Sequence, residues 1–356
     1  MFKKILLSIV KFGISFSILG YLFYRAWQDH SFEELAAQPK AWSLLGSAYA
    51  LAMVAISITY VRWFLLVRGL ELPFTLKDAF RLGFIGYLFN FLTLGVVGGD
   101  ALKAIFVARQ IPDRKAAAIA TVGVDRVIGL FALFVVASVA YLSVDLSAIT
   151  TSSPGELIAV QRTGMLAVAM TIAGIAAYLV LLVPRVSASR MFERIGFFPK
   201  LGGFLDRLID AMRIYRRKPV LLIATGLMSL CVHSLNVMAI FLIACGLPGD
   251  QPSFGTHFMI VPIAMLAGAV PLPGGLGAFE FALDFLYRGV SSRAMIEGQG
   301  FVIALAFRVI TLMIAAIGVV YYLASRREVS EAIKQAEEQD RQQSENVNAA
   351  PEAIVS

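Results

Sequence analysis

Two arginines lie inside long apolar stretches of the sequence. Arg126 and Arg308 each stand nine residues after the start of such a stretch, which is roughly 14 Å along a helix that rises 1.5 Å per residue. A charged side chain at that depth in hydrocarbon costs ~2.5–3.5 kcal/mol even on the mildest scales, so it needs a partner or a function. The planar guanidinium suits bidentate contact with a phosphate or a carboxylate. We therefore weigh two roles that can both hold: gripping an anion, and tying down nearby carbonyls or carboxylates.

Two carboxylates follow paired glycines. Asp100 comes directly after a Gly-Gly pair, and Glu280 comes just after another. We expect Asp100 to cap the helix that it opens, in preference to contacting a ligand. We expect Glu280 to lie in the first turn of its helix, where a carboxylate complements the helix dipole. Lys103 stands three residues after Asp100 and can pair with it, whereas Asp125 adjoins Arg126 but points to another face.

Paired glycines also let backbone N–H groups approach an anion closely. The candidate binding residues are therefore Arg126, Arg308, Gly98, Gly99, Asp100, Gly274, Gly275, Glu280, Asp125 and Lys103.

Catalytic and metal-binding patterns are missing from the sequence. His30, His233 and His257 are scattered, and Cys231 and Cys245 are too far apart along one helix to bridge. The phosphate-binding pattern G-x-x-x-x-G-K-[ST] does not occur. We expect no catalytic residue, no metal and no cofactor.

The composition shows where these residues must lie. Hydrophobic residues make up 58% of the 356 residues and charged residues only 15%, against ~45–50% and ~25% in soluble proteins. The net charge of +7 belongs to loops that orient the chain, so it does not indicate nucleic acid. The fold class is an all-α polytopic membrane protein.

Six apolar runs are long enough for the ~20 residues of a membrane span: 5–27, 42–67, 117–142, 164–184, 219–246 and 299–324. Loop 185–218 is strongly basic, whereas loops 28–41 and 143–163 carry more acidic than basic residues. Basic loops stay in the cytoplasm. This places both termini in the cytoplasm of a multi-pass protein of the cell (inner) membrane.

Two apolar segments, 79–108 and 256–288, do not fit this count as full spans, since a crossing at 79–97 would invert every later loop. We predict two re-entrant hairpins that enter from opposite sides and break at 95–100 and 271–275. Such breaks are tolerated at membrane depth where they are buried in protein or line a wet cavity. The alternative is two ordinary spans with flexible ends.

The two halves of the sequence match once the hairpins are placed. Gly69-Leu70 closes the second span and Gly246-Leu247 the fifth, and both halves then reach Arg-Val-Ile-x-Leu, at Arg126 and Arg308. Each half, about 5–142 and 164–324, has three crossings, so the halves must be inverted. Inverted repeats of this kind are typical of secondary transporters, whose broken helices meet around the substrate.

The remaining segments complete the domain organisation. The membrane domain covers 1–327 and includes a basic interfacial segment at 185–218, and a polar, partly disordered tail follows at 328–356. Arg62 lies near the cytoplasmic end of its span, and we expect it to reach the interface. His233 and Asn236 are expected to form hydrogen bonds between helices.

Four motifs, in this order, resemble one family: Tyr87 to Asp100 with its Gly-Gly-Asp, the basic stretch that follows, Val124-Asp-Arg-Val-Ile-Gly-Leu130, and Pro271 to Glu280. They are similar to the flippase-like membrane domain, also called the lysylphosphatidylglycerol synthase transmembrane region, over about residues 5–325. In aminoacyl-lipid synthases this domain is thought to move the modified lipid between leaflets, and a separate C-terminal domain makes it. Only 29 residues follow Arg327 here, so we expect no lysyl transfer and no enzyme.

The leading functional expectation is a lipid flippase or transporter whose phosphate-bearing or modified lipid has its headgroup held between the hairpins. The expected partners are membrane lipids with an anionic or phosphate-bearing headgroup, a separate lipid-modifying enzyme, and no nucleic acid. Two alternatives stay open: a polyprenyl-phosphate-dependent membrane transferase with Asp100 or Glu280 as general base, and a non-transporting accessory protein for lipid or glycolipid synthesis.

Overall fold

The computed structural model describes residues 38–92, 96–110, 114–145, 154–182, 217–269, 276–290 and 298–326, together with Tyr215 and parts of 13–28. The regular secondary structure of these residues is entirely helical. In chain order the helices are α3 (Trp42–Gly69), α4 (Leu76–Leu92), α5 (Val96–Gln110), α6 (Lys115–Ser143), α7 (Pro154–Leu182), α10 (Pro219–Gly246), α11 (Phe254–Gly268), α12 (Ala278–Val290) and α13 (Gln299–Ala324).

Five of the described helices are long and apolar enough to cross a membrane: α3, α6, α7, α10 and α13. They confirm the spans predicted at 42–67, 117–142, 219–246 and 299–324. The span predicted at 164–184 belongs to a helix that begins ten residues earlier, at Pro154. Glu156, in the first turn of this helix, pairs with Arg288 of α12 at 3.1 Å. The expected span 5–27 and segment 185–218 lie largely outside the described residues, and the tail 328–356 lies wholly outside.

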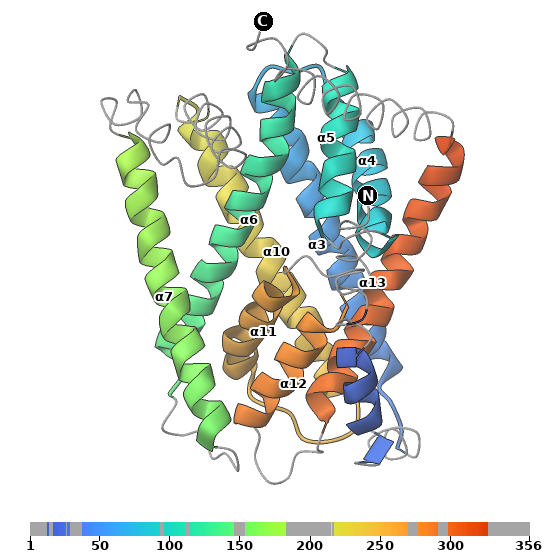
Figure 1. Cartoon of the computed structure of the whole chain (residues 1–356), viewed down its shortest axis with the longest axis vertical. Coiled ribbons are helices and arrows are strands. Elements are labelled where there is room, and N and C mark those ends of the chain that lie inside the picture. The colour runs from blue at the N-terminus through green and yellow to red at the C-terminus, as the bar shows by residue number, and fades with distance from the viewer. Residues whose placement is uncertain are drawn as a thin grey trace, which may run out of the picture.

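The two segments predicted as hairpins each form a pair of short helices. They hold 17 and 15 residues in α4 and α5, and 15 and 13 in α11 and α12. At 1.5 Å per residue none reaches the ~30 Å thickness of a bilayer core. Figure 1 shows α4 and α5 in one half of the molecule's height and α11 and α12 in the other. Each pair of short helices thus lies in its own half of the molecule's height, and neither pair contains a helix long enough to cross a bilayer by itself. That the two pairs re-enter the membrane as hairpins from opposite sides stays a prediction.

The first break, predicted at 95–100, does not extend over residues 96–100, and residues 93–95 between α4 and α5 lie outside the described residues. Helix α5 begins at Val96, so Gly98 and Gly99 are helical. A Cβ on Gly99 would lie 2.0 Å from the carbonyl oxygen of Gly86 in α4. The glycine therefore allows the two arms to pack closely. The second break, 271–275, lies outside the described residues.

Helices α3 and α10 run antiparallel through the centre. The backbone N–H of Ala41, before α3, donates to the carbonyl of Gly246 at the end of α10, at 3.0 Å. At the other end, Gly69 packs against Tyr215 and Leu221. Because these helices hold equivalent places in the two halves and run in opposite directions, they agree with the inverted repeat predicted from the sequence.

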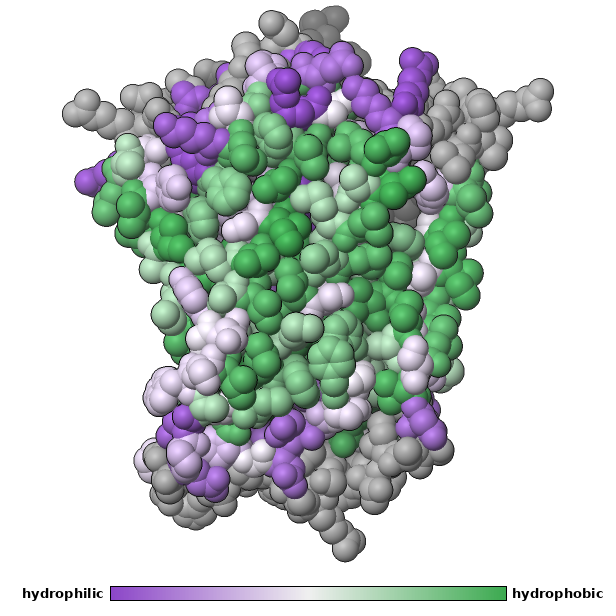
Figure 2. Space-filling model, turned by 180° about the vertical axis from the view of Figure 1, so that it is seen from behind, coloured by the Kyte–Doolittle hydropathy of each residue, from purple (hydrophilic) through white to green (hydrophobic). Residues whose placement is uncertain are grey.

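The first short helix of each half packs against the final long helix of the other half. Helix α4 packs on α13, and its counterpart α11 packs on α6 in the same way. Within each half, α5 packs on α6 and α12 on α13. Figure 2 shows a band of apolar surface between two hydrophilic ends. Large apolar side chains such as Val139 and Val320 are exposed on the described helices. The fold is that of a polytopic helical membrane protein.

Candidate functional site

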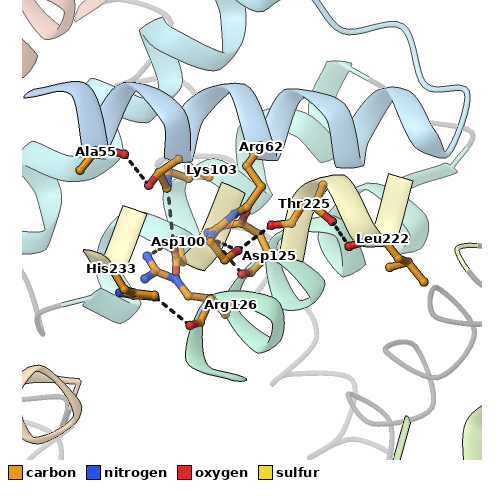
Figure 3. Close-up of polar contacts among 12 residues, drawn as sticks. Ala55, Arg62, Asp100, Lys103, Asp125, Arg126, Leu222, Thr225 and His233 are labelled. Carbon is orange, nitrogen blue, oxygen red and sulfur yellow. Dashed lines mark hydrogen bonds and ion pairs between the residues drawn. The ribbon is translucent and has the colours of Figure 1, made fainter. Parts of the chain in front are cut away.

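An ion pair joins the first hairpin to the helix that follows it. Arg126 of α6 donates from Nε and Nη2 to the two carboxylate oxygens of Asp100 in α5, with 2.7 Å between Nη2 and Oδ1. Figure 3 shows both side chains side by side. The expectation that Asp100 caps its helix was wrong, because α5 begins four residues earlier and its carboxylate is taken up by arginine.

Lys103 is a second cation beside Asp100. Its Nζ lies 3.7 Å from Oδ1 of Asp100, which confirms the predicted pairing. The ammonium also lies 5.9 Å and 5.5 Å from the ring centroids of Tyr60 and Trp63 in α3. These aromatic faces stabilise the buried cation.

A second, fully buried ion pair lies beside the first. Arg62 of α3 donates from Nε to Asp125 at 2.8 Å and from Nη1 to the Ser229 hydroxyl of α10 at 2.6 Å. Arg62 and Asp125 are only 4% and 6% exposed, and Figure 3 shows Arg62 directed toward Asp125. The expectation that Arg62 reaches the interface was wrong, since a carboxylate and a hydroxyl on two other helices compensate its charge inside the bundle.

The two pairs form one cluster of three cations and two carboxylates, namely Arg62, Lys103, Arg126, Asp100 and Asp125. It therefore carries one excess positive charge. The Arg126 side chain is 45% exposed, whereas that of Asp100 is 16% exposed. Among the described residues, Nη1 of Arg126 has no hydrogen-bond partner. Arg126 is therefore the most accessible cation of this positively charged cluster.

The second half repeats the ion pair at the corresponding place. Nε of Arg308 in α13 donates to Glu280 of α12 at 2.7 Å. The other oxygen of Glu280 accepts the backbone N–H of Gly277 at 2.9 Å, so Glu280 holds the first turn as predicted. The Arg308 guanidinium lies 5.8 Å from the ring centroid of Phe91, in the last turn of α4. It thus also contacts the hairpin of the other half.

A cavity of about 210 Å³ lies where the halves meet. Its walls come from α3, α4, α10, α11 and α13, and the polar groups among them belong to Thr59, Tyr87, Asn236 and Thr311. The sequence analysis had singled out only Asn236 of these four, as a residue that hydrogen-bonds between helices. That expectation was wrong for the described part of the chain, in which the Asn236 side chain makes no hydrogen bond and lines the cavity instead. Thr59 could have been found as its counterpart, because both stand ten residues before the glycine that ends their helix.

Comparison with known proteins assigns the family. A family model described as the lysylphosphatidylglycerol synthase TM region matches residues 8–318. The chain belongs to this family. No curated protein and no solved structure matches it. The protein is therefore a membrane protein related to lipid synthesis or flipping.

The match covers the transmembrane region, and both ion pairs of this family member lie within it. The structure brings together Asp100, Lys103 and Arg126, and separately Glu280 and Arg308. Asp125 pairs with Arg62 instead. Gly274 and Gly275 lie outside the described residues. No described contact joins Arg126 directly to Arg308, so a joint grip on one ligand stays a prediction.

Two expectations concern groups outside the ion pairs. The Nε2 atom of His233 in α10 lies 2.9 Å from the carbonyl oxygen of Gly129 in α6, which confirms a hydrogen bond between helices. Cys231 and Cys245 are free. Within the described ranges, no group of three or more His, Cys, Asp or Glu side chains could hold a metal ion.

Proposed function

We propose that this protein moves a phosphate-bearing lipid between the leaflets of a cell membrane, with the headgroup passing the two hairpins at mid-depth. The observation that carries this proposal is the half-exposed guanidinium of Arg126. It stands eleven residues after the start of α6, roughly 16 Å along the helix.

An exposed arginine at this depth is unfavourable against lipid tails, so its surroundings must be wet or anionic. Its buried partner Asp100 already shares the cation of Lys103, which leaves part of the Arg126 charge for another anion. A guanidinium with one free edge binds a phosphate oxygen by charge-assisted hydrogen bonds. A lipid whose headgroup crosses from one leaflet to the other carries its phosphate past this depth, so a lipid phosphate is the anion that we expect here.

The arrangement of the halves supports transport. Inverted repeats with broken helices place a substrate site at mid-depth and change its access when one half moves against the other. In this proposal both hairpins re-enter the membrane, from opposite sides. The described basic residues at the ends of α3, α5 and α13 and the starts of α6 and α10, such as Arg68, Arg109, Arg326, Lys115 and Lys218, share one end of the molecule. That end faces the cytoplasm under the positive-inside rule, in the inner membrane.

The described acidic groups of the site argue for binding over chemistry. Asp100, Asp125 and Glu280 each accept a hydrogen bond from an arginine. These contacts direct each carboxylate toward an arginine, whereas a general base must reach the proton of a substrate. We therefore assign no enzymatic step to this site.

A flipping assay tests the proposal. The purified protein is reconstituted in vesicles that contain a trace of phosphatidylglycerol labelled on its acyl chain, and dithionite bleaches the label in the outer leaflet. Wild-type protein should make the inner-leaflet label accessible. Arg126→Ala should slow this by about tenfold to a hundredfold, since a hydrogen bond to a charged group is worth about 1.5–3 kcal/mol. Arg126→Lys should fall between the two.

Arg217→Ala is the matched control, because it removes an exposed arginine at the basic end of the molecule and should leave the rate unchanged. Wild-type vesicles that bleach no further than protein-free vesicles would refute lipid transport. An Arg126→Ala rate equal to that of wild type would remove this arginine from the path.

A further inference from the structure

The cavity between the halves is polar without being charged. Its full lining is Ala52, Ala55, Ile56, Thr59, Tyr87, Val232, Asn236, Met265, Phe307, Thr311 and Ile314. None of these side chains is ionised at neutral pH. A ligand that entered with a full charge would lose its hydration and find no opposite charge on these walls.

The polar groups can still bind hydroxyls. The Thr59 hydroxyl donates to the carbonyl of Ala55 within its own helix at 3.1 Å, which leaves its lone pairs to accept a hydrogen bond. The Asn236 amide makes no hydrogen bond to the described residues, so it offers donors as well as an acceptor. Because Thr59 and Asn236 occupy equivalent places on the antiparallel helices α3 and α10, they face one cavity from its two sides.

Arg308 is a neighbour of this cavity but not part of its lining. It follows the lining residue Phe307 along α13, and its backbone carbonyl accepts the hydroxyl of the lining residue Thr311 at 2.8 Å. Its guanidinium rests over Phe91, one turn of α4 beyond Tyr87. A phosphate held at Arg308 would thus stand next to the neutral polar groups.

We propose that the cavity binds the neutral, hydroxyl-bearing part of a phosphate-linked lipid headgroup, a small polyol, with the phosphate toward Arg308. This inference rests on the proposed function and names its substrate class. It excludes a headgroup that carries a lysyl ammonium, since no carboxylate lines the cavity. The volume of about 210 Å³ exceeds the ~150 Å³ of an engineered cavity that holds benzene. Glycerol has the same number of non-hydrogen atoms as benzene.

The test compares lipids that differ only in the headgroup. The protein in mild detergent is offered an equimolar mixture of phosphatidylglycerol, phosphatidylethanol, lysylphosphatidylglycerol and a polyprenyl-phosphate hexose, and native mass spectrometry measures which lipid stays bound. Phosphatidylethanol keeps the phosphate charge of phosphatidylglycerol and lacks its hydroxyls. The same lipids, labelled on the hydrophobic chain, are used in the flipping assay.

The variant is Thr59→Val with Asn236→Leu, which removes the hydrogen-bonding groups at nearly constant volume. Thr163→Val is the matched control, because the Thr163 hydroxyl of α7 also donates to its own helix, at 2.8 Å to Ala159, and lines no part of the cavity. Wild-type protein and Thr163→Val should retain a polyol lipid over phosphatidylethanol by about tenfold or more, because a site built for hydroxyls rejects an analogue without them. The double variant should retain phosphatidylethanol as wild type does and lose the preference.

Each outcome decides a separate point. The lipid that is retained most, phosphatidylglycerol or the hexose lipid, identifies the source of the polyol. Equal retention of phosphatidylethanol and both polyol lipids, or a preference for lysylphosphatidylglycerol, overturns the inference. Selective retention without flipping refutes the proposed function and leaves the inference standing. Flipping without a preference for polyol lipids supports the proposed function and overturns the inference about the cavity.

Discussion

The two halves of the molecule share an order of helices but differ in what lies beside their central helices. Each half contains, in the same order, a 28-residue helix (α3 or α10), two short helices and a final long one. In the first half Arg62 and Asp125 form a buried ion pair. The corresponding positions in the second half, seven residues before the closing glycine and directly before the matched arginine, hold Ala239 and Phe307.

The difference extends to the third member of the network. Ser229, which accepts the Arg62 bond, corresponds to Ala52, seventeen residues before its closing glycine. Ala52 and Phe307 both line the cavity. The hydrogen-bonded network of Arg62, Asp125 and Ser229 therefore fills one place between the long helices. Two of the three positions that correspond to it across the two halves line an open cavity.

This comparison separates the features that both halves share from those that only one half has. The ion pairs of Arg126 with Asp100 and of Arg308 with Glu280 join each pair of short helices to its long helix and are common to both halves. The buried network of Arg62, Asp125 and Ser229 joins α3, α6 and α10 by an ion pair and a hydrogen bond. The cavity has no such network and leaves room for a ligand. The following exchanges should affect the two halves unequally.

The largest effect should come from Asp125→Leu. It leaves Arg62 buried without its carboxylate, which costs about 3–5 kcal/mol of stability. We expect a strong fall in the thermal unfolding midpoint in detergent, followed by tryptophan fluorescence, and little folded protein. The double exchange Arg62→Met with Asp125→Leu should recover most of the loss, since no unpaired charge remains. A single exchange as stable as wild type would show that the network is not needed for the fold.

The matched arginines should differ in their cost to stability. Arg308→Ala leaves Glu280, which is 1% exposed, without a cation, so we expect a loss of about 2–3 kcal/mol. Arg126→Ala leaves Asp100 beside Lys103 and should cost about 1 kcal/mol or less. Unfolding midpoints of both variants, measured side by side, check this. Equal midpoints would mean that the two ion pairs are equivalent after all.

The hairpins should differ in their tolerance of a methyl group. Gly99→Ala places a Cβ 2.0 Å from a backbone oxygen of α4, so the arms must separate, at about 1–3 kcal/mol. In the second hairpin, Gly268→Ala brings its Cβ to 3.1 Å from the Phe279 side chain, which needs only a small shift. Folded yield by size-exclusion chromatography should fall for the first exchange only. A fall of equal size for both would contradict the packing difference.

The smallest effect is expected at the basic end. A hydrogen bond from Lys218 and the charge of this lysine hold the pKa of Glu71 below its ordinary value. The pair therefore stabilises the folded protein at any pH above the pKa that Glu71 has in the unfolded chain. This stabilisation is lost as the pH falls through the lower pKa that Glu71 has in the folded protein. Glu71 is fully exposed, and solvent screens the pair. Lys218→Met should therefore unfold at the same midpoint as wild type at neutral and acidic pH. A clear loss at neutral pH alone would show a stronger pair than the exposure implies.

Much of the scaffold could be predicted from the sequence. Span length, the glycines at 69 and 246, and the repeated Arg-Val-Ile-x-Leu depend on local composition, and the long helices confirm them. Glu280 was placed correctly because its role lies within one helical turn. Loop charge also gave an orientation consistent with the basic end.

The pairings of the site could not be predicted in the same way. Arg62 finds Asp125 and Ser229 on two other helices, and this depends on how the helices rotate about their axes, which apolar periodicity leaves open. Asp100 was misplaced because Gly-Gly suggests a break, whereas the glycines here allow α4 and α5 to pack. The cavity results from the small side chains of Ala52 and Ala55 across helices, a feature that spacing along one chain does not show.

The most direct test asks whether Arg126 faces a wet path at mid-depth. In a background without Cys231 and Cys245, Arg126→Cys is treated in vesicles with a charged, membrane-impermeant thiol reagent, and Val139→Cys serves as the lipid-facing control. Thiolates react and thiols buried in lipid do not, so we predict labelling at position 126, protection by added phosphatidylglycerol, and none at 139. Equal, negligible labelling at both positions would contradict a translocation path at Arg126.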